Sequence, residues 1–123
     1  MVAADTSAWI DYARGTASPM AHKLENALLD GTLVIPLPVL YEVLSGPGLT
    51  QTAETAILAL PQLNLWIGFW ERAAIMRRKL LQRGQKARSM DCMIAQNCID
   101  HDIALITTDT DYRHFRSFGL RHA

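Results

Sequence analysis

Short runs of apolar residues alternate with longer amphipathic segments along the chain. Four runs have the length of buried strands, namely MVAAD (1–5), TLVIP (32–36), LNLW (63–66) and ALITT (104–108), and GLRHA (119–123) would form a frayed fifth strand. Short apolar strands separated by helical patterns favour a parallel sheet with helices on both faces.

The segments between these runs carry helix signals at their ends. We expect helices within residues 6–13, 18–31, 38–48, 50–60, 68–84 and 89–102. The second of these has Ser18 as its N-cap and Gly31 as its stop. Thr6 or Ser7 would cap the first helix, and Ser89 would cap the last.

Acidic residues directly follow the first and fourth predicted strands. Asp5 ends the first strand, and Asp109 and Asp111 lie in TTDTDY (107–112). Parallel α/β sheets place their sites outside the carboxyl ends of the strands, where the strand order reverses. If the first and fourth strands are neighbours at that reversal, these three carboxylates come together.

Two helical acids point to the same edge of the sheet. Asp91 shares a helix face with the apolar Ile94 and Cys98, which aims it inward, whereas the alternative is an acid that only complements the helix dipole. Glu42 lies within VLYEVL, one turn after the second strand, and the alternative for it is a solvated helix position. The coincidence of four such acidic positions at one edge predicts a shared site.

A cluster of acids at one edge has a chemical consequence. Carboxylates that lie this close repel one another, so a cation must offset their charge. Hard oxygen ligands select Mg²⁺ or Mn²⁺ rather than zinc. Acids around one or two such ions activate water and stabilise the transition state of phosphodiester cleavage.

The amino-acid composition indicates the number of domains, the state of the cysteines and the compartment that we expect for this protein. The 123 residues, half of them apolar, predict a single domain that spans 1–123, and the 12 basic and 12 acidic residues cancel. Cys92 and Cys98 have neither redox nor zinc-site spacing, so we expect buried thiols in a reducing compartment. With no signal peptide and no apolar run near the roughly 20 residues of a membrane span, we expect a cytoplasmic protein without membrane contact.

At this point the motifs resemble a known family. DTS (5–7), LYEVLSG (40–46), SMDCMIA (89–95) and TTDTDY (107–112) together resemble the PIN-domain ribonucleases, above all the VapC-type toxins of VapBC toxin–antitoxin systems. The resemblance covers nearly the whole chain. It implies a three-layer α/β/α sandwich with a central parallel sheet in the order 3-2-1-4-5. It also implies Mg²⁺- or Mn²⁺-dependent cleavage of RNA, often tRNA, a homodimer, and an antitoxin partner that covers the site.

The same resemblance assigns the site residues. The family's four acidic positions fall on Asp5, Glu42, Asp91 and Asp109, and a fifth position, often acidic, falls on Asp111. Asp5, Asp91 and Asp109 would hold the first metal ion. Glu42 and Asp111 would orient water or help to hold a second ion.

Three further positions follow from the motifs. Ser7 and Thr107 match small polar residues that help to hold metal or water, and Tyr112 stands where Phe is more usual. Because water rather than a 2′-hydroxyl would attack phosphorus, we expect products with 5′-phosphate and 3′-hydroxyl ends.

Basic residues gather in one stretch of this neutral chain. Residues 71–88 hold seven of the 12 basic residues and carry a net charge of +6. Attraction of RNA phosphates is the functional interpretation, with Lys86, Arg88 and Arg83 as the RNA-binding residues nearest the predicted site. The alternative is a solvated helix face.

Other functions fit the sequence less well. A phosphate-receiver domain normally has paired acids after its first strand and a Lys after its fifth, and no Lys occurs here after Lys86. A dehalogenase-type phosphatase carries its Asp pair after the first strand, not near the chain's end. A PIN nuclease of RNA processing and a non-catalytic scaffold that binds RNA or a partner remain as alternatives.

Overall fold

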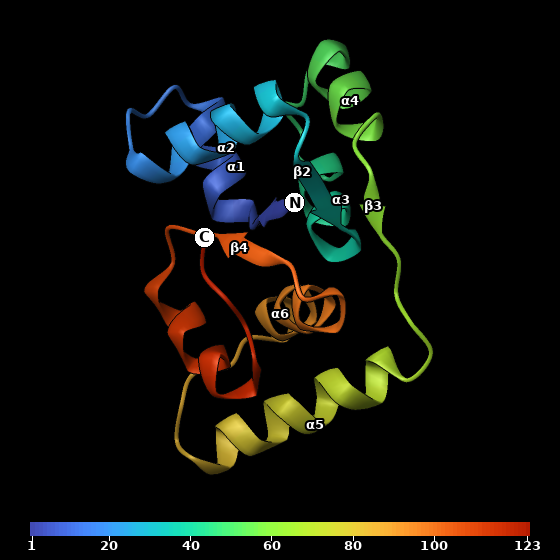
Figure 1. Ribbon diagram of the computed structural model, residues 1–123, viewed down its shortest axis with the longest axis vertical. Coiled ribbons are helices and arrows are strands. Elements are labelled where there is room, and N and C mark those ends of the chain that lie inside the picture. Colours follow the sequence, from blue (N-terminus) through green and yellow to red (C-terminus); the bar gives the residue numbers. More distant parts are fainter.

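A parallel sheet forms the centre of the computed structural model, which describes residues 1–123 (Figure 1). Its strands are β1 (Val2–Ala4), β2 (Leu33–Pro36), β3 (Gln62–Leu63) and β4 (Ala104–Ile106), in the order β3-β2-β1-β4. Ala3 pairs with Val34 on one side and with Leu105 on the other. The predicted α/β class with a central parallel sheet is confirmed.

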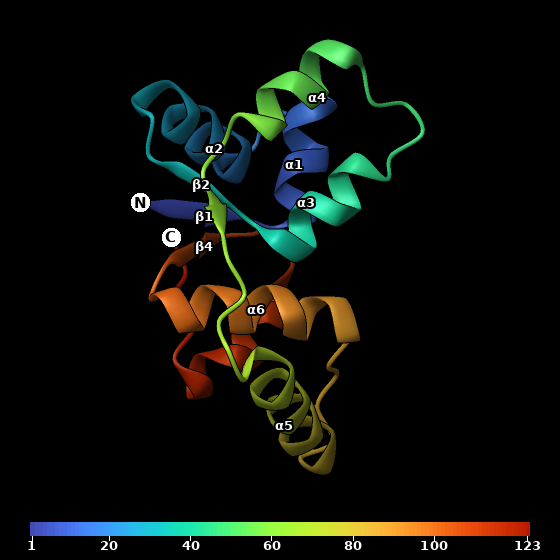
Figure 2. The ribbon, with the colours of Figure 1, turned by 90° about the vertical axis from the view of Figure 1, so that its right-hand side faces the viewer.

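Helices cover both faces of this sheet. They are α1 (Thr6–Ala13), α2 (Pro19–Asp30), α3 (Leu37–Leu44), α4 (Gln51–Leu58), α5 (Phe69–Gln82), α6 (Ser89–His101) and the 3₁₀ segment η1 (Thr110–Phe118). Figure 2 shows α1, α2 and α4 on one side, with α6 and η1 on the other. Helix α5 packs outside α6 rather than on the sheet.

The core lies between these layers because the strands are buried on both faces. All four residues of β2 are buried, and Ala3, Ala4 and Leu105 are fully inaccessible. This explains why the strands are continuous apolar runs and do not alternate with polar residues. No helix of the protein combines the length and the hydropathy that a membrane crossing requires.

Two strand predictions need correction. The third strand is Gln62–Leu63, not 63–66, because the carbonyl of Asn64 is bonded by side chains of α6 instead of a neighbouring strand. The predicted fifth strand, 119–123, is a single bridge between Leu105 and His122, although it occupies the expected place beside β4. The order 3-2-1-4 is therefore as predicted, and the fifth position is filled by one bridge.

Helix caps were predicted with mixed success. Ser18 caps α2 and Gly31 ends it with a positive φ of 68°, as predicted. Neither Thr6 nor Ser7 caps α1, because Asp5 accepts the hydrogen bond from the Ala8 amide at 3.0 Å. The predicted cap Ser89 is the first residue of α6, and the N-cap position is held by Arg88 without a side-chain bond.

Candidate active site

The predicted site residues come from segments that meet at the carboxyl edge of the sheet. Strand β1 leads to Asp5 and α1, β2 leads directly into α3, and β4 leads into the loop that carries Asp109. Helices α1 and α3 begin at this edge, and α6 presents its N-terminal turn there (Figure 2). The parallel arrangement therefore brings together residues about 100 positions apart in the chain.

Asp5 lies at the centre of this edge and is only 3% exposed. Its carboxylate accepts hydrogen bonds from the Ser7 hydroxyl at 2.8 and 2.9 Å, the Ala8 amide at 3.0 Å and the Thr107 hydroxyl at 2.6 Å. Burial raises the pKa of Asp5, the three donors lower it in part, and the charge of Asp109 raises it further. A desolvated carboxylate in a fixed orientation results.

The loop after β4 is bonded to α1 through hydroxyl groups. Thr107 donates to Asp5 and accepts the amide of Asp109 at 3.0 Å. Thr108 donates its hydroxyl to Ser7 at 2.8 Å. The structure thus places Ser7 and Thr107, the two predicted accessory residues, directly around Asp5.

Asp109 and Asp91 complete a group of three interacting carboxylates. Burial raises the pKa of Asp91, and the charges of Asp109 and Asp5 raise it further. Tyr112, whose hydroxyl donates to Asp91 at 3.3 Å, and the nearby Arg88 lower this pKa in part. The pKa of Tyr112 is itself raised by burial and by the charges of Asp5 and Asp91, so its hydroxyl stays protonated and acts as a donor.

Glu42 reaches the site through a neighbour of Asp5. The Thr6 hydroxyl donates to Glu42 at 2.5 Å. Helix α3, which carries Glu42, is fixed at its first residue because the Leu37 amide donates to the buried Asn97 of α6 at 3.1 Å. The half-buried Glu42 thus lies at the same edge, as the sequence predicted.

Asp111 forms an ion pair that the sequence did not predict. Its carboxylate lies 3.4 Å from the ammonium of Lys86, with both side chains partly exposed. Two of the three predicted RNA-binding residues therefore have contacts within the chain, because Arg83 also bonds Ser117 and lies 5.0 Å from the Phe118 ring centre. Arg88, three residues before Asp91 in the chain, is the N-cap residue of α6, and its side chain forms no capping hydrogen bond.

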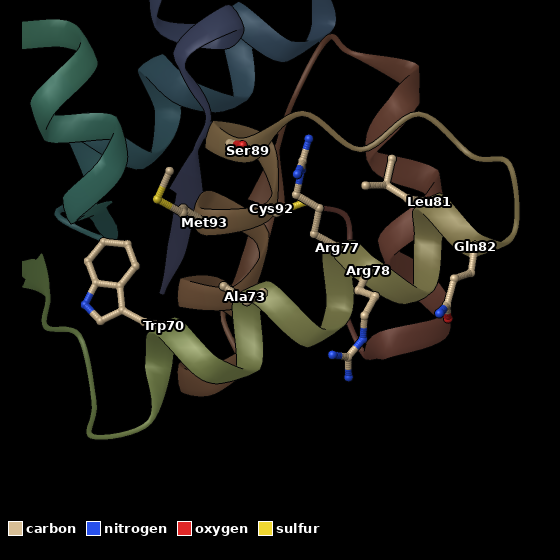
Figure 3. Close-up of a pocket in the computed structure, with 10 residues that line it drawn as sticks. Trp70, Ala73, Arg77, Arg78, Leu81, Gln82, Ser89, Cys92 and Met93 are labelled. Atoms are coloured by element: carbon tan, nitrogen blue, oxygen red, sulfur yellow. The ribbon is translucent and has the colours of Figure 1, made fainter.

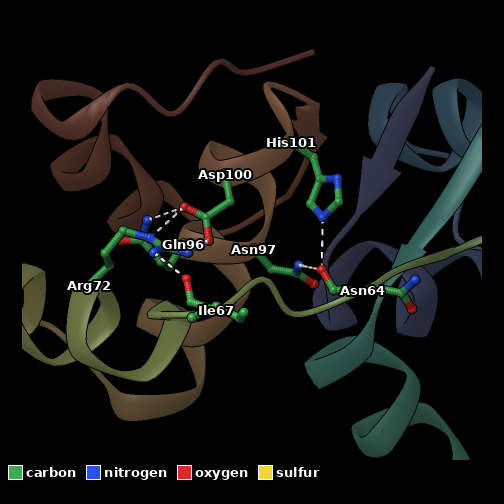
Figure 4. Close-up of polar contacts among 7 residues, drawn as sticks. All are labelled: Asn64, Ile67, Arg72, Gln96, Asn97, Asp100 and His101. Carbon is green, nitrogen blue, oxygen red and sulfur yellow. Dashed lines mark hydrogen bonds and ion pairs between the residues drawn. The ribbon is translucent and has the colours of Figure 1, made fainter.

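The basic stretch also supplies structural contacts between α5 and α6. Figure 4 shows Arg72 forming two bonds to Asp100, at 3.0 and 2.6 Å, while Gln96 donates to the same carboxylate at 2.9 Å. Arg77 donates to the carbonyl of Ala87 at 2.9 Å. Part of the positive charge of residues 71–88 is therefore engaged in contacts within the protein and is not available to a ligand.

A separate groove lies between α5 and α6 (Figure 3). It has a volume of about 660 Å³ and is lined mainly by apolar residues, with Trp70 at one end and Arg77 and Arg78 along it. None of the predicted acidic residues lines this groove. The acid cluster and this groove are thus different parts of the surface.

The chemistry of the acid cluster fits a hard divalent cation. Its donors are carboxylate and hydroxyl oxygens, the type that Mg²⁺ and Mn²⁺ prefer. One oxygen of Asp91 and one of Asp109 accept no hydrogen bond from the protein. Cys98, buried near Asp5, has its pKa raised to about 12 and stays a thiol. In this structure no three His, Cys, Asp or Glu side chains are arranged so that together they could hold a metal ion.

Comparison with known proteins gives matches of three kinds. The family model described as PIN domain matches residues 2–117. Ribonuclease VapC11 of Mycobacterium tuberculosis is 33% identical over 119 residues, which cover 91% of this chain and 89% of that protein. A VapC ribonuclease of Mycobacterium bovis matches to the same extent.

Solved structures support the fold. VapBC2 from Rickettsia felis, bound to a DNA fragment from their promoter, has a TM-score of 0.73 at 18% identity and covers 100% of this chain and 98% of that one. FitAcB from Neisseria gonorrhoeae has a TM-score of 0.71 at 15% identity, with 100% and 97% covered.

Proposed function

This chain belongs to the PIN-domain family, and on that basis we propose that it is a metal-dependent endoribonuclease of the VapC type. The observation that carries the proposal is the coupling of Asp5, Asp91 and Asp109. Each comes from a different segment, and the charge of Asp109 raises the pKa of both other carboxyls. Carboxylates that repel one another in a partly buried site create a position where a cation is favoured.

Asp5, Asp91 and Asp109 are the residues that would hold Mg²⁺ or Mn²⁺. Such an ion lowers the pKa of water and offsets the charge that develops on the phosphodiester during cleavage. Glu42 and Asp111, the two acids outside this group of three, are suited to orient water or to help hold a second ion. Both already make a contact at the edge of the cluster, with Thr6 and Lys86 respectively.

The protein's own groups orient the reaction. Ser7 and Thr107 fix both oxygens of Asp5, which leaves this carboxylate little freedom to rotate. Water activated at the site attacks phosphorus in line with the leaving 3′-oxygen, so the RNA 2′-hydroxyl takes no part. Products with 5′-phosphate and 3′-hydroxyl ends follow from this scheme, and 2′,3′-cyclic phosphate ends would contradict it.

The biological role that we propose is that of a toxin neutralised by an antitoxin, acting in the cytoplasm on RNA such as tRNA. The curated relatives are named VapC ribonucleases, and the solved neighbours include VapBC proteins. A homodimer is supported by exposed apolar side chains, namely Tyr41 of α3 and Trp66, Ile67 and Trp70 around the start of α5, of which Tyr41 and Trp70 line one pocket.

The experiment that tests the proposal uses protein freed of antitoxin, total cellular RNA, and Mg²⁺ or Mn²⁺. Reactions with EDTA and with the Asp5→Asn variant run beside it, and RNA ends are mapped by sequencing. We expect discrete cuts that disappear in both controls. RNA that binds but is never cut would instead favour a non-catalytic scaffold, and specific maturation of a precursor RNA would favour an RNA-processing nuclease.

A further inference from the structure

Tyr112 carries a hydroxyl group into the interior of the protein. It is 1% exposed, and its ring packs against Phe115 with 5.6 Å between ring centres. A buried hydroxyl costs free energy unless it forms a hydrogen bond. The one bond of this hydroxyl runs to Oδ1 of Asp91 at 3.3 Å.

Asp91 depends on this bond more than Asp5 depends on any single donor. Asp5 has three donor groups, from Ser7, Ala8 and Thr107, which bond both of its oxygens. Asp91 has only the Tyr112 hydroxyl, which leaves its Oδ2 without a donor from the protein. Without that hydroxyl, no hydrogen bond from the protein would fix the orientation of the carboxylate.

Tyr112 is in turn fixed relative to the loop that carries Asp109. Segment η1 begins after Asp109, whose Oδ1 accepts the Asp111 amide at 2.9 Å, and the Tyr112 amide approaches the Asp109 carbonyl at 3.4 Å. Segment η1 also packs on α6, the helix of Asp91. Tyr112 therefore contacts both Asp91 and Asp109, the two acids that each have one carboxylate oxygen without a hydrogen bond from the protein.

We propose that Tyr112 is a positioning residue, whose hydroxyl fixes Oδ1 of Asp91 and so keeps Oδ2 available for a divalent cation. This inference rests on the proposed metal-dependent function. The ring alone fills the core, and phenylalanine would fill the same space. The hydroxyl adds an orienting contact behind a ligand, of the kind whose loss typically weakens metal binding 10- to 100-fold, as a rough range.

The test compares Mn²⁺ affinity in the wild type and in Tyr112→Phe, without RNA, by titration calorimetry and by electron paramagnetic resonance of free Mn²⁺. We expect the variant to bind Mn²⁺ roughly tenfold more weakly, at the lower end of that range because the bond is long. Its metal-free melting temperature should stay close to that of the wild type. Tyr12→Phe is the matched control, since it removes a hydroxyl that makes no hydrogen bond and should leave Mn²⁺ affinity unchanged.

The outcomes separate this inference from the function on which it rests. Equal Mn²⁺ affinity in the wild type and in Tyr112→Phe would overturn the positioning role while leaving the nuclease proposal intact. A Tyr112→Phe protein that does not fold would also overturn it, because the hydroxyl would then serve folding. A wild type that binds no Mn²⁺ would refute the metal-dependent function itself.

Discussion

Thr107 donates its hydroxyl to Asp5 at 2.6 Å, and these two residues, 102 positions apart in the chain, follow neighbouring strands. The same hydroxyl accepts the amide of Asp109 at 3.0 Å. One side chain therefore joins two of the three acids proposed to hold metal. This relationship depends on the β1–β4 pairing, because the two strands must be adjacent for their ends to meet.

Replacing Thr107 by valine should reduce cleavage while the fold persists. Valine has nearly the same shape but cannot orient Asp5, so we expect kcat/KM to fall roughly 10- to 100-fold. The free energy of unfolding should fall by about 1–2 kcal/mol, since a bond to a carboxylate is lost at a partly exposed position. RNA cleavage rates and urea unfolding measure the two effects. Thr52→Val, at an exposed position without a hydrogen bond, is the control, and full activity in Thr107→Val would refute the orienting role.

Asp91→Asn should abolish cleavage and raise the stability of the metal-free protein. The pKa values of Asp5 and Asp91 are raised above the ordinary 3.8, so the native state holds these protons to higher pH than the unfolded chain. Their contribution to the free energy of unfolding is therefore greatest below pH 3.8. It is lost as the pH rises through the raised pKa values of the folded state. Removing one charge should lift the neutral-pH melting temperature by roughly 2–5 °C.

Melting curves from pH 3 to 8 in EDTA test this claim, and the Asp91→Asn curve should depend less on pH than that of the wild type. Glu25→Gln, at an exposed position of α2, controls for the loss of any negative charge. A sharp fall in the melting temperature of Asp91→Asn would show that the acid is structural.

Arg88→Gln should weaken RNA binding in a salt-dependent way. Arg88 lies near enough to Asp91 for its charge to lower the pKa of that acid, and its side chain forms no capping hydrogen bond, so its charge can meet a phosphate. Losing one phosphate contact should reduce the slope of log affinity against log salt by about 1. Catalytically inactive Asp5→Asn protein allows RNA binding to be measured by filter assay across salt concentrations. Arg83→Gln should change the slope less, because that guanidinium lies against Phe118, and the opposite ranking would contradict the assignment.

Arg72→Met should destabilise the fold without removing the active site. The Asp100 side chain is only 7% exposed, so losing Arg72 leaves a largely buried carboxylate without a cation and with Gln96 as its remaining side-chain donor. We expect the free energy of unfolding to fall by about 2–3 kcal/mol. Arg78→Met removes a charge on the same helix and should change stability by less than about 0.5 kcal/mol. If the two variants are equally stable, the contact contributes nothing measurable.

The sequence was sufficient to predict the fold class because buried parallel strands are short runs of apolar residues. It misplaced the third strand, since Leu65 and Trp66 are apolar but the Asn64 carbonyl is bonded by side chains of α6. Such bonds join residues more than 30 positions apart and leave no local pattern. For the same reason the sequence could not show that Arg72 pairs with Asp100.

Asp5, Asp91 and Asp109 were predicted because each lies at a strand end or a helix start, and Glu42 because it lies on the helix that follows the second strand. The donors around them were predicted less completely. Ser7 and Thr107 belong to the motifs, but the bond from Thr6 to Glu42 depends on how α1 faces α3. Tyr112 stood out only as a tyrosine where phenylalanine is usual, and nothing local linked its hydroxyl to Asp91.

The double role of Asp5 has a consequence for how degenerate relatives of this chain would look. Its carboxylate begins α1 as the N-cap and also belongs to the acid cluster, so folding alone is a reason to retain it. Asp91 caps nothing, and its charge is repelled by its neighbours. In a relative that has lost activity, we therefore expect Asp91 to be replaced by another residue before Asp5 is. An intact DTS motif at residues 5–7 would then be poor evidence of catalytic activity. The residue at position 91 would indicate activity more reliably.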